Sequence, residues 1–137
     1  MKICSEETCK FWTPRILGIL RIVTAFLFLQ HGTAKLLGIP HVAMFDNLQL
    51  FSLIGLAGML ELGGGVLILL GLFTRPAAFI LSGEMAVAYF MAHAPHGLLP
   101  ILNQGELAVM YCFVFLYLSV AGAGEFSLDA LRRKGKG

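Results

Sequence analysis

Four long apolar segments constrain the fold of this chain more than any other feature. They cover about 15–37, 53–73, 76–94 and 104–122, and short stretches that contain Gly and Pro separate them. Crossing ~30 Å of hydrocarbon takes about 20 helical residues, so each segment is long enough to span a membrane. Side chains that are 58% hydrophobic and only 13% charged exclude a water-soluble monomer and a disordered chain. The sequence therefore predicts an all-α integral membrane protein, an antiparallel four-helix bundle in a lipid bilayer.

Turn residues at the segment ends predict where the helices begin and end. Pro14 fits the first turn of the first helix, and Gly38 marks its end. Pro76 restarts a helix immediately after the second segment, which predicts a tight hairpin. Asn103 and Glu106 have the spacing of a capping box at the start of the last helix.

The basic residues predict the orientation of the bundle. Eight of the ten lie at one end of the predicted helices: Lys2, Lys10, Arg15, Arg75, Arg132, Arg133, Lys134 and Lys136. The positive-inside rule then places both termini in the cytoplasm. The predicted parts are a tail over 1–14, a membrane domain over 15–124 and a basic tail over 125–137. The outer loops are 39–52, which has the pattern of a short interfacial helix, and 95–103.

The small net charge and the cysteines exclude some classes of function. A dispersed net charge of +2 does not favour nucleic acid as a partner. In a cytoplasmic tail Cys4 and Cys9 are expected as free thiols, with a redox, acylation or metal-binding role as the alternatives. Cys112 fits a small apolar residue that packs against another helix. No set of four donors is present in the pattern, so no metal site is predicted.

Ionisable residues inside the predicted spans are the candidates for function. They are Arg21, His31, Lys35, Glu61, Glu84, His93 and Glu106. A charged side chain at the bilayer centre costs about 2.5 to 3.5 kcal/mol, so these side chains should face one another or water. Two interpretations remain open at this point. The charges are structural links between helices, or they line a polar cavity for a small ligand or a proton path.

Depth along the helices predicts which of these groups can pair. At ~1.5 Å per residue, Arg21 and Glu84 lie at similar depths, which permits an ion pair. Lys35 and Glu106 both lie near the outer end and form a second expected pair. Glu61 is near the midplane with no cation at its own depth, so its neutral form is expected.

Four short motifs carry a resemblance to a known family. They are FLQHGTAKLLG at 28–38, ELGGGVLILLGLFTR at 61–75, NQGE at 103–106 and GAGEFSLD at 122–129. Together they resemble the DoxX family of small four-helix bacterial membrane proteins, over about residues 15–131. The matched polar positions are His31, Lys35, Glu61, Arg75, Glu106, Ser127 and Asp129. Gln104 departs from the pattern, which has glycine there.

The resemblance implies a bacterial inner-membrane location and a link to redox chemistry. Relatives in this family include the membrane subunit of a thiosulfate:quinone oxidoreductase and proteins named as oxidoreductases of quinone, catechol or thiol stress. One branch is proposed to form a membrane complex with a superoxide dismutase and a sulfurtransferase. No motif for a flavin, haem or iron–sulfur cluster is present in the sequence. A redox enzyme, soluble or in the membrane, is therefore the implied partner.

The leading hypothesis is a membrane subunit of an oxidoreductase system that binds a quinone or related phenolic molecule between the helices. The residues expected to carry the proton chemistry are Glu61, Glu84 and Arg21. The residues expected to bind the ligand are His31, Lys35, Glu106, Phe28 and Tyr111. One alternative is a non-catalytic anchor or assembly factor for a soluble partner enzyme. A small-molecule transporter is a weaker alternative, because four helices without an inverted repeat would require a homo-oligomer.

Overall fold

The computed structural model describes residues 5–135, and every regular element within that range is a helix. The four main helices are α1 (Glu6–Leu37), α2 (Leu53–Leu70), α3 (Thr74–Ala88) and α5 (Glu106–Ala121). The shorter elements are the 3-10 turns η1 (Ala43–Phe45) and η3 (Ala94–His96), the π-helical turn η2 (Tyr89–His93), α4 (Pro100–Asn103) and α6 (Leu128–Lys134). The all-α prediction is confirmed.

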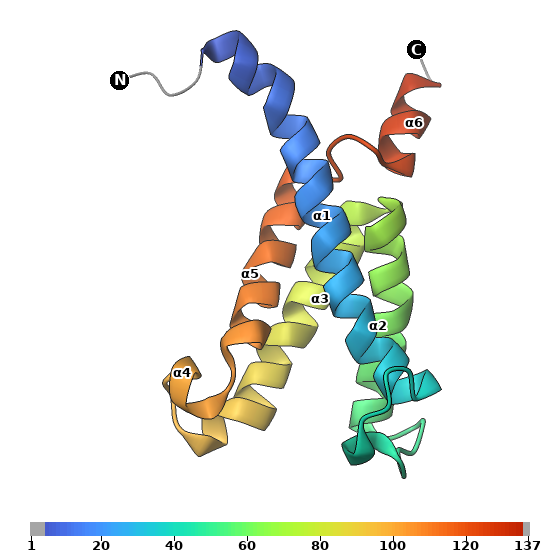
Figure 1. The fold of residues 1–137 in the computed structure, drawn as a ribbon, viewed down its shortest axis with the longest axis vertical. Helices are drawn as coiled ribbons and strands as arrows, with labels where there is room; N and C mark the ends of the chain where they lie inside the picture. The colour runs from blue at the N-terminus through green and yellow to red at the C-terminus, as the bar shows by residue number, and fades with distance from the viewer. Residues whose placement is uncertain (1–4, 136–137) are drawn as a thin grey trace.

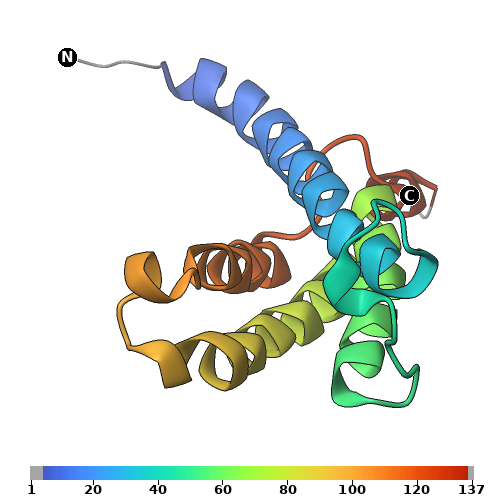
Figure 2. The ribbon, with the colours of Figure 1, turned by 60° about the horizontal axis from the view of Figure 1, so that its bottom comes forward.

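The four main helices form two packed pairs. Helix α1 packs chiefly on α2, and α3 packs chiefly on α5, while a smaller contact between α2 and α3 joins the pairs. The backbones of α1 and α5 lie farther apart than those of the paired helices (Figures 1 and 2), and aromatic side chains bridge the space between them. The first turns of α1 project beyond the rest of the bundle (Figure 1).

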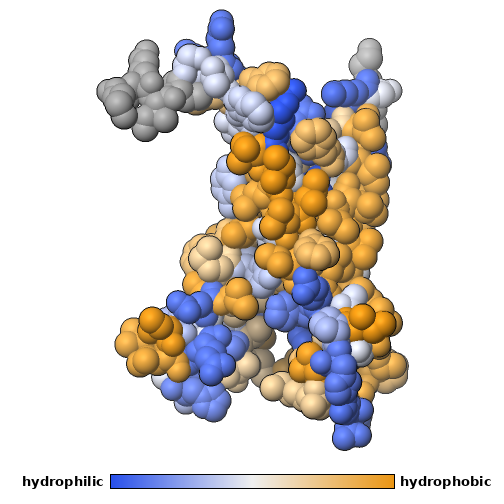
Figure 3. Space-filling view, viewed as in Figure 1, coloured by the Kyte–Doolittle hydropathy of each residue, from blue (hydrophilic) through white to orange (hydrophobic). Residues whose placement is uncertain are grey.

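Length and composition identify this chain as a membrane protein. Helices α1 and α2 and the continuous segment Thr74–His96 are each long and apolar enough to cross a bilayer. Helix α5 is equally apolar but has 16 residues, about 24 Å at ~1.5 Å per residue. On the face that Figure 3 shows, apolar residues cover the middle of the molecule, and hydrophilic residues gather at both ends. Four complete spans and the direction of the termini stay predictions.

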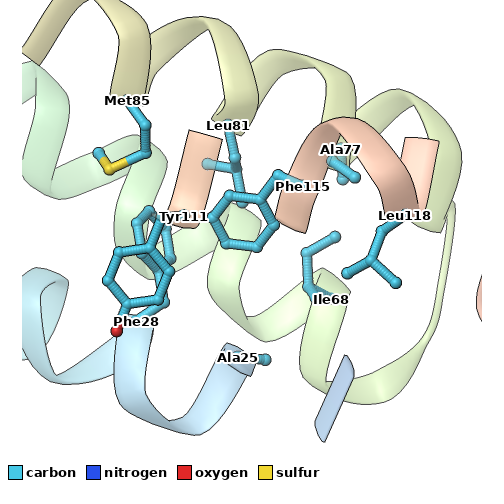
Figure 4. Packing of buried hydrophobic residues seen from close by; sticks show 10 residues of the cluster. Ala25, Phe28, Ile68, Ala77, Leu81, Met85, Tyr111, Phe115 and Leu118 are labelled. Atoms are coloured by element: carbon cyan, nitrogen blue, oxygen red, sulfur yellow. The ribbon is translucent and has the colours of Figure 1, made fainter. Parts of the chain in front are cut away.

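A narrow core of large side chains holds the two pairs together. The fully buried apolar residues Phe28, Ile68, Leu81, Phe115 and Leu118 come from all four main helices (Figure 4). The rings of Phe28 and Phe115 meet edge to face, with centroids 4.8 Å apart. The outward-facing apolar side chains are exposed, as expected for surfaces that contact lipid.

Two predicted features of the N-terminal region are wrong. Helix α1 begins at Glu6 and contains Pro14, because the Ser5 hydroxyl caps it by accepting a 3.2 Å hydrogen bond from the Thr8 amide. The predicted tail over 1–14 is therefore largely helical, and residues 1–4, with Cys4, lie outside the described residues. Cys9 is disulfide-bonded, so the free thiol expected there is also wrong. That expectation followed from a cytoplasmic location, which the tail's composition does not fix.

The ends of the other helices also differ from the prediction. Helix α2 stops at Leu70, because Gly71 takes a left-handed conformation with φ of 63°. The predicted capping box at α5 is wrong, since Asn103 ends α4, and its side-chain oxygen accepts a 2.8 Å hydrogen bond from the Gly105 amide. The interfacial helix expected in 39–52 is only the three-residue turn η1. The predicted basic tail contains α6, which Ser127 caps.

Candidate functional site

An ion pair between α1 and α2 is the centre of the candidate site. The Lys35 ammonium lies 2.5 Å from a carboxylate oxygen of Glu61, and these side chains are 14% and 4% exposed. The predicted pairing of Lys35 with Glu106 is wrong, as is the expectation that Glu61 has no cation near it. Side chains on a helix lean toward its N-terminus, so the long lysine reaches inward by about one turn. Glu106 is left exposed at the start of α5.

Two glycines bring α1 and α2 close enough for this pair to form. A Cβ atom at Gly32 would lie 2.6 Å from the backbone nitrogen of Leu62, a distance that real Cβ atoms do not adopt. A Cβ at Gly58 would lie 3.1 Å from the Cβ of Lys35. Small residues permit this backbone approach between membrane helices. The glycines therefore set the distance that the Lys35–Glu61 pair spans.

Glu84 reaches the same region from α3. It lies within electrostatic range of both Glu61 and Lys35. Both Glu84 carboxylate oxygens are buried with no hydrogen-bond partner in the described part of the chain, and the same is true of the second Glu61 oxygen. Buried polar atoms normally have partners, because leaving them unpaired costs free energy. These three oxygens can bind a proton or accept hydrogen bonds from a ligand.

Aromatic rings lie next to His31 in the same region. Tyr111 of α5 lies edge-on to Phe28 and His31 of α1, with ring centroids 5.1 and 6.0 Å apart. The Tyr111 phenol oxygen points toward α1 (Figure 4). His31 is also within electrostatic range of Glu61 and Lys35. We call His31, Lys35, Glu61 and Glu84 the Lys35 cluster. The rings of Phe28 and Tyr111 form its aromatic wall.

The end of the bundle that carries the C-terminus of α1 is hollowed. There the molecule divides into two lobes, and hydrophilic residues gather on both sides of the hollow (Figure 3). The two lobes correspond to the α1/α2 and α3/α5 pairs (Figure 1). Since the Lys35 cluster combines residues of α1, α2 and α3, it lies where the pairs meet.

Arg21 has a different role from the one predicted. The predicted ion pair with Glu84 is wrong, since the fully buried guanidinium donates hydrogen bonds to backbone carbonyls. The acceptors are the carbonyl oxygens of Ala123 (2.9 Å), Ile68 (2.6 Å), Leu69 (2.5 Å), Phe126 (2.8 Å) and Glu125 (3.5 Å). The last carbonyls of a helix have no partner within it, and Arg21 satisfies two of them in α2. It ties α1, α2 and the segment after α5 together, apart from the Lys35 cluster.

A second polar network, centred on the buried Asn103, closes the loop before α5. Asn103 donates a 2.5 Å hydrogen bond to the Gly97 carbonyl, and the His93 ring lies 3.0 Å from the Asn103 carbonyl oxygen. The Tyr89 hydroxyl donates to the Leu98 carbonyl at 2.7 Å. This role of Asn103 was not predicted from the sequence. Its position among the Gly and Pro residues of a loop was the available signal.

Asp129 joins α6 to the start of α3. Its carboxylate oxygens accept hydrogen bonds from the backbone amides of Phe73 (3.0 Å) and Thr74 (2.9 Å). Burial alone would raise the pKa of this carboxyl, but the hydrogen bonds and the nearby Arg132 outweigh it and hold the pKa below its ordinary value. The resemblance marked Asp129 as a matched position, and the structure shows that it caps α3. Within residues 5–135 no three His, Cys, Asp or Glu side chains come together as metal ligands.

Comparison with known proteins decides the family. A family model described as DoxX matches residues 16–94. The chain belongs to the DoxX family. The matched region contains the α1, α2 and α3 residues that form the Lys35 cluster. No solved structure matches the chain significantly.

Relatives of this DoxX-family protein cover nearly its whole length. An uncharacterised protein of Haemophilus influenzae is 48% identical over 86% of this chain and 91% of its own length. The Bacillus subtilis protein named "Putative oxidoreductase CatD" is 27% identical, over 86% and 87% of the two chains. The Escherichia coli protein named "Inner membrane protein YqjF" is 28% identical, over 85% and 91%.

Proposed function

We propose that this DoxX-family membrane protein binds a quinone or a related phenolic molecule at the Lys35 cluster, as the membrane subunit of an oxidoreductase system. The observation that carries the proposal is a set of three buried carboxylate oxygens that have no partner within residues 5–135, on two residues that interact electrostatically with Lys35. The rings of Phe28 and Tyr111 lie next to His31 of the same cluster. A ring with polar oxygens matches this combination of apolar wall and hydrogen-bonding groups. The printed name of the relative CatD supports the link to redox chemistry.

Charge balance assigns roles to Lys35, Glu61 and Glu84 in the cluster. Two carboxylates and one ammonium leave one negative charge uncompensated if both carboxylates are ionised, which is costly inside a membrane. A proton on Glu84 removes that charge and turns Glu84 into a hydrogen-bond donor to a carbonyl oxygen of the ligand. Lys35 stabilises negative charge that develops on the oxygen, and Glu61 keeps the ammonium in place.

The expected reaction can be written with its protons and electrons. Reduction of a quinone to a quinol takes up two electrons and two protons. A partner redox enzyme supplies the electrons. Glu84 delivers one proton to a quinone oxygen, takes up another from water and delivers it to the second oxygen, while Glu61 stays ionised beside Lys35. Phe28 and Tyr111 contact the ring and fix its orientation.

The same proposal includes the placement in the membrane. We place the chain in a bacterial inner membrane with four spans and both termini in the cytoplasm. The excess of Lys and Arg at the end that bears α6 supports this orientation, and the printed name of the relative YqjF supports the membrane. The Lys35 cluster then lies in the outer half of the bilayer.

The alternative function is a non-catalytic anchor for a soluble enzyme. The observation that favours it is α6, which Asp129 fixes at the end of the bundle with basic residues in its last turn. Removing residues 128–137 tests it by partner recovery from native membranes. Loss of the partner on truncation, with no effect of Glu61→Gln on quinone-dependent electron transfer, favours the anchor.

The experiment for the main proposal is chemical identification of the bound molecule. The full chain is purified from its native membrane in mild detergent, and extracted molecules are identified by mass spectrometry. We expect about one quinone or phenolic molecule per chain, with retention lost in Lys35→Met and kept in Glu106→Gln. A protein that neither retains nor binds a quinone contradicts the proposal.

A further inference from the structure

A second polar site lies at the opposite end of the bundle from the hollow. A cavity of about 320 Å³ opens there, between the turn that joins α2 to α3 and helix α6. Three arginines line it, Arg75, Arg132 and Arg133, together with one acidic residue, Asp129, and the apolar Phe73 and Pro76. None of these residues belongs to the Lys35 cluster, so a ligand in this cavity is independent of the proposed function.

Backbone hydrogen bonds hold α6 in the position that builds this cavity. The Asp129 amide donates a 2.8 Å hydrogen bond to the Gly71 carbonyl at the end of α2. The Asp129 carboxylate accepts the amides of Phe73 and Thr74 at the start of α3. Three hydrogen bonds that involve Asp129 therefore fix α6 against the α2–α3 turn, and Arg132 and Arg133 line the same cavity as Arg75.

Two of the arginines are exposed but have contacts within the chain. Arg75 donates a 2.5 Å hydrogen bond to the Val120 carbonyl, and its guanidinium lies against Gly122, with two nitrogens 3.4 Å from where a Cβ would stand. The Arg132 guanidinium carbon lies 5.0 Å from the centre of the Phe73 ring. Side chains that are already ordered lose less entropy when they bind a ligand.

The positive charge of the cavity has no direct counter-ion among residues 5–135. No acidic side chain in that range lies within 4.0 Å of a guanidinium nitrogen of the three arginines. Asp129 is within electrostatic range of Arg132, but both its oxygens are taken by backbone amides. The site thus presents several N–H donors and a net positive charge, a combination that suits an anion.

We propose that this cavity binds a phosphate group, and that its source is the headgroup of an anionic phospholipid. Arginine recognises phosphate through paired N–H donors, and three guanidinium groups surround one cavity of suitable size. Phe73 and Phe79 are 53% and 66% exposed at this end of α2 and α3, where they offer a surface to acyl chains. On the face that Figure 3 shows, the apolar surface reaches this polar end, the depth at which lipid phosphates lie.

The test measures lipid binding to the delipidated full chain in uncharged detergent. The protein is titrated with phosphatidylglycerol, with phosphatidylcholine and, separately, with inorganic phosphate. Each titration is monitored by native mass spectrometry and by thermal unfolding. We expect one tightly held phosphatidylglycerol, no comparable phosphatidylcholine, and a rise in unfolding temperature with lipid concentration. Arg132→Ala and Arg75→Lys weaken binding at least about tenfold, and Lys134→Ala, the matched control on α6 outside this cavity, changes it less than about twofold.

Each outcome has a definite meaning. Equal loss in Lys134→Ala and Arg132→Ala shows binding by overall charge and overturns the site. Unchanged binding in the arginine variants overturns it as well. Inorganic phosphate that binds through these arginines while phosphatidylglycerol does not overturns the lipid as the source. Circular dichroism checks that each variant is folded, and Arg75→Lys keeps the charge at the position whose side chain also contacts Val120 and Gly122.

Discussion

Replacing Arg21 tests whether this residue stabilises the end of the bundle that carries α6. Arg21→Met removes four hydrogen bonds of 2.5 to 2.9 Å to backbone carbonyls of α2 and of the segment after α5. A hydrogen bond to a charged group contributes about 1.5 to 3 kcal/mol, but such values do not add fully within one network. Removing the buried charge also recovers some desolvation energy. We therefore expect a net loss of about 3 kcal/mol in the free energy of unfolding.

The assay is reversible unfolding of the purified protein by added SDS, followed by circular dichroism. Arg15→Met, on the same helix, is the matched control, because within residues 5–135 Arg15 donates only to the Phe11 carbonyl of its own helix. We expect that control to stay within about 1 kcal/mol of wild type. If Arg21→Met proves too unstable to purify, Arg21→Lys retains the charge with fewer donors and should fall in between. A stability of Arg21→Met within about 1 kcal/mol of wild type refutes the reasoning.

Three further predictions concern the cluster, the α6 contact and helix packing. Lys35→Met and Glu61→Met should each destabilise the protein, and the double variant should recover most of the loss, as a double-mutant cycle will measure. The pKa of Asp129 is below its ordinary value of 3.8, so its contribution is present above that pH and is lost as the pH falls through the lowered value. The unfolding temperature should therefore fall at acidic pH, and less so in Asp129→Asn. Gly32→Ala should cost about 1 to 3 kcal/mol in SDS unfolding. Gly63→Ala, which meets no atom within 4 Å, should cost almost nothing.

Hydrophobicity and turn residues predicted the helices well. Apolar segments of membrane-spanning length became α1, α2, α3 and α5, and Gly38 ends α1 where expected. The start of α1 was missed because Pro14 is tolerated inside a helix that Ser5 caps earlier. Ser5 and Pro14 are both signals for the start of a helix, and the sequence does not say which of them is used.

The partners of the buried charges were harder to predict. The depth of each residue along its predicted helix paired Arg21 with Glu84 and Lys35 with Glu106. Depth takes no account of the direction in which side chains lean, or of the close approach of the helices at Gly32. Arg21 donates to backbone carbonyl oxygens. Every residue has such an oxygen, so the sequence does not reveal which ones Arg21 contacts. The polar residues themselves were found because the bilayer makes each of them costly.

Photo-cross-linking with an azido-quinone tests most directly whether a quinone binds at the Lys35 cluster. The purified chain is illuminated with the probe, with and without excess unlabelled quinone, and the modified peptides are mapped by mass spectrometry. We predict labels near Phe28 to Lys35 of α1 and near Tyr111 of α5, which disappear on competition and in Lys35→Met. Labels spread over the lipid-facing surface, unaffected by competitor or by that substitution, would contradict quinone binding at this cluster.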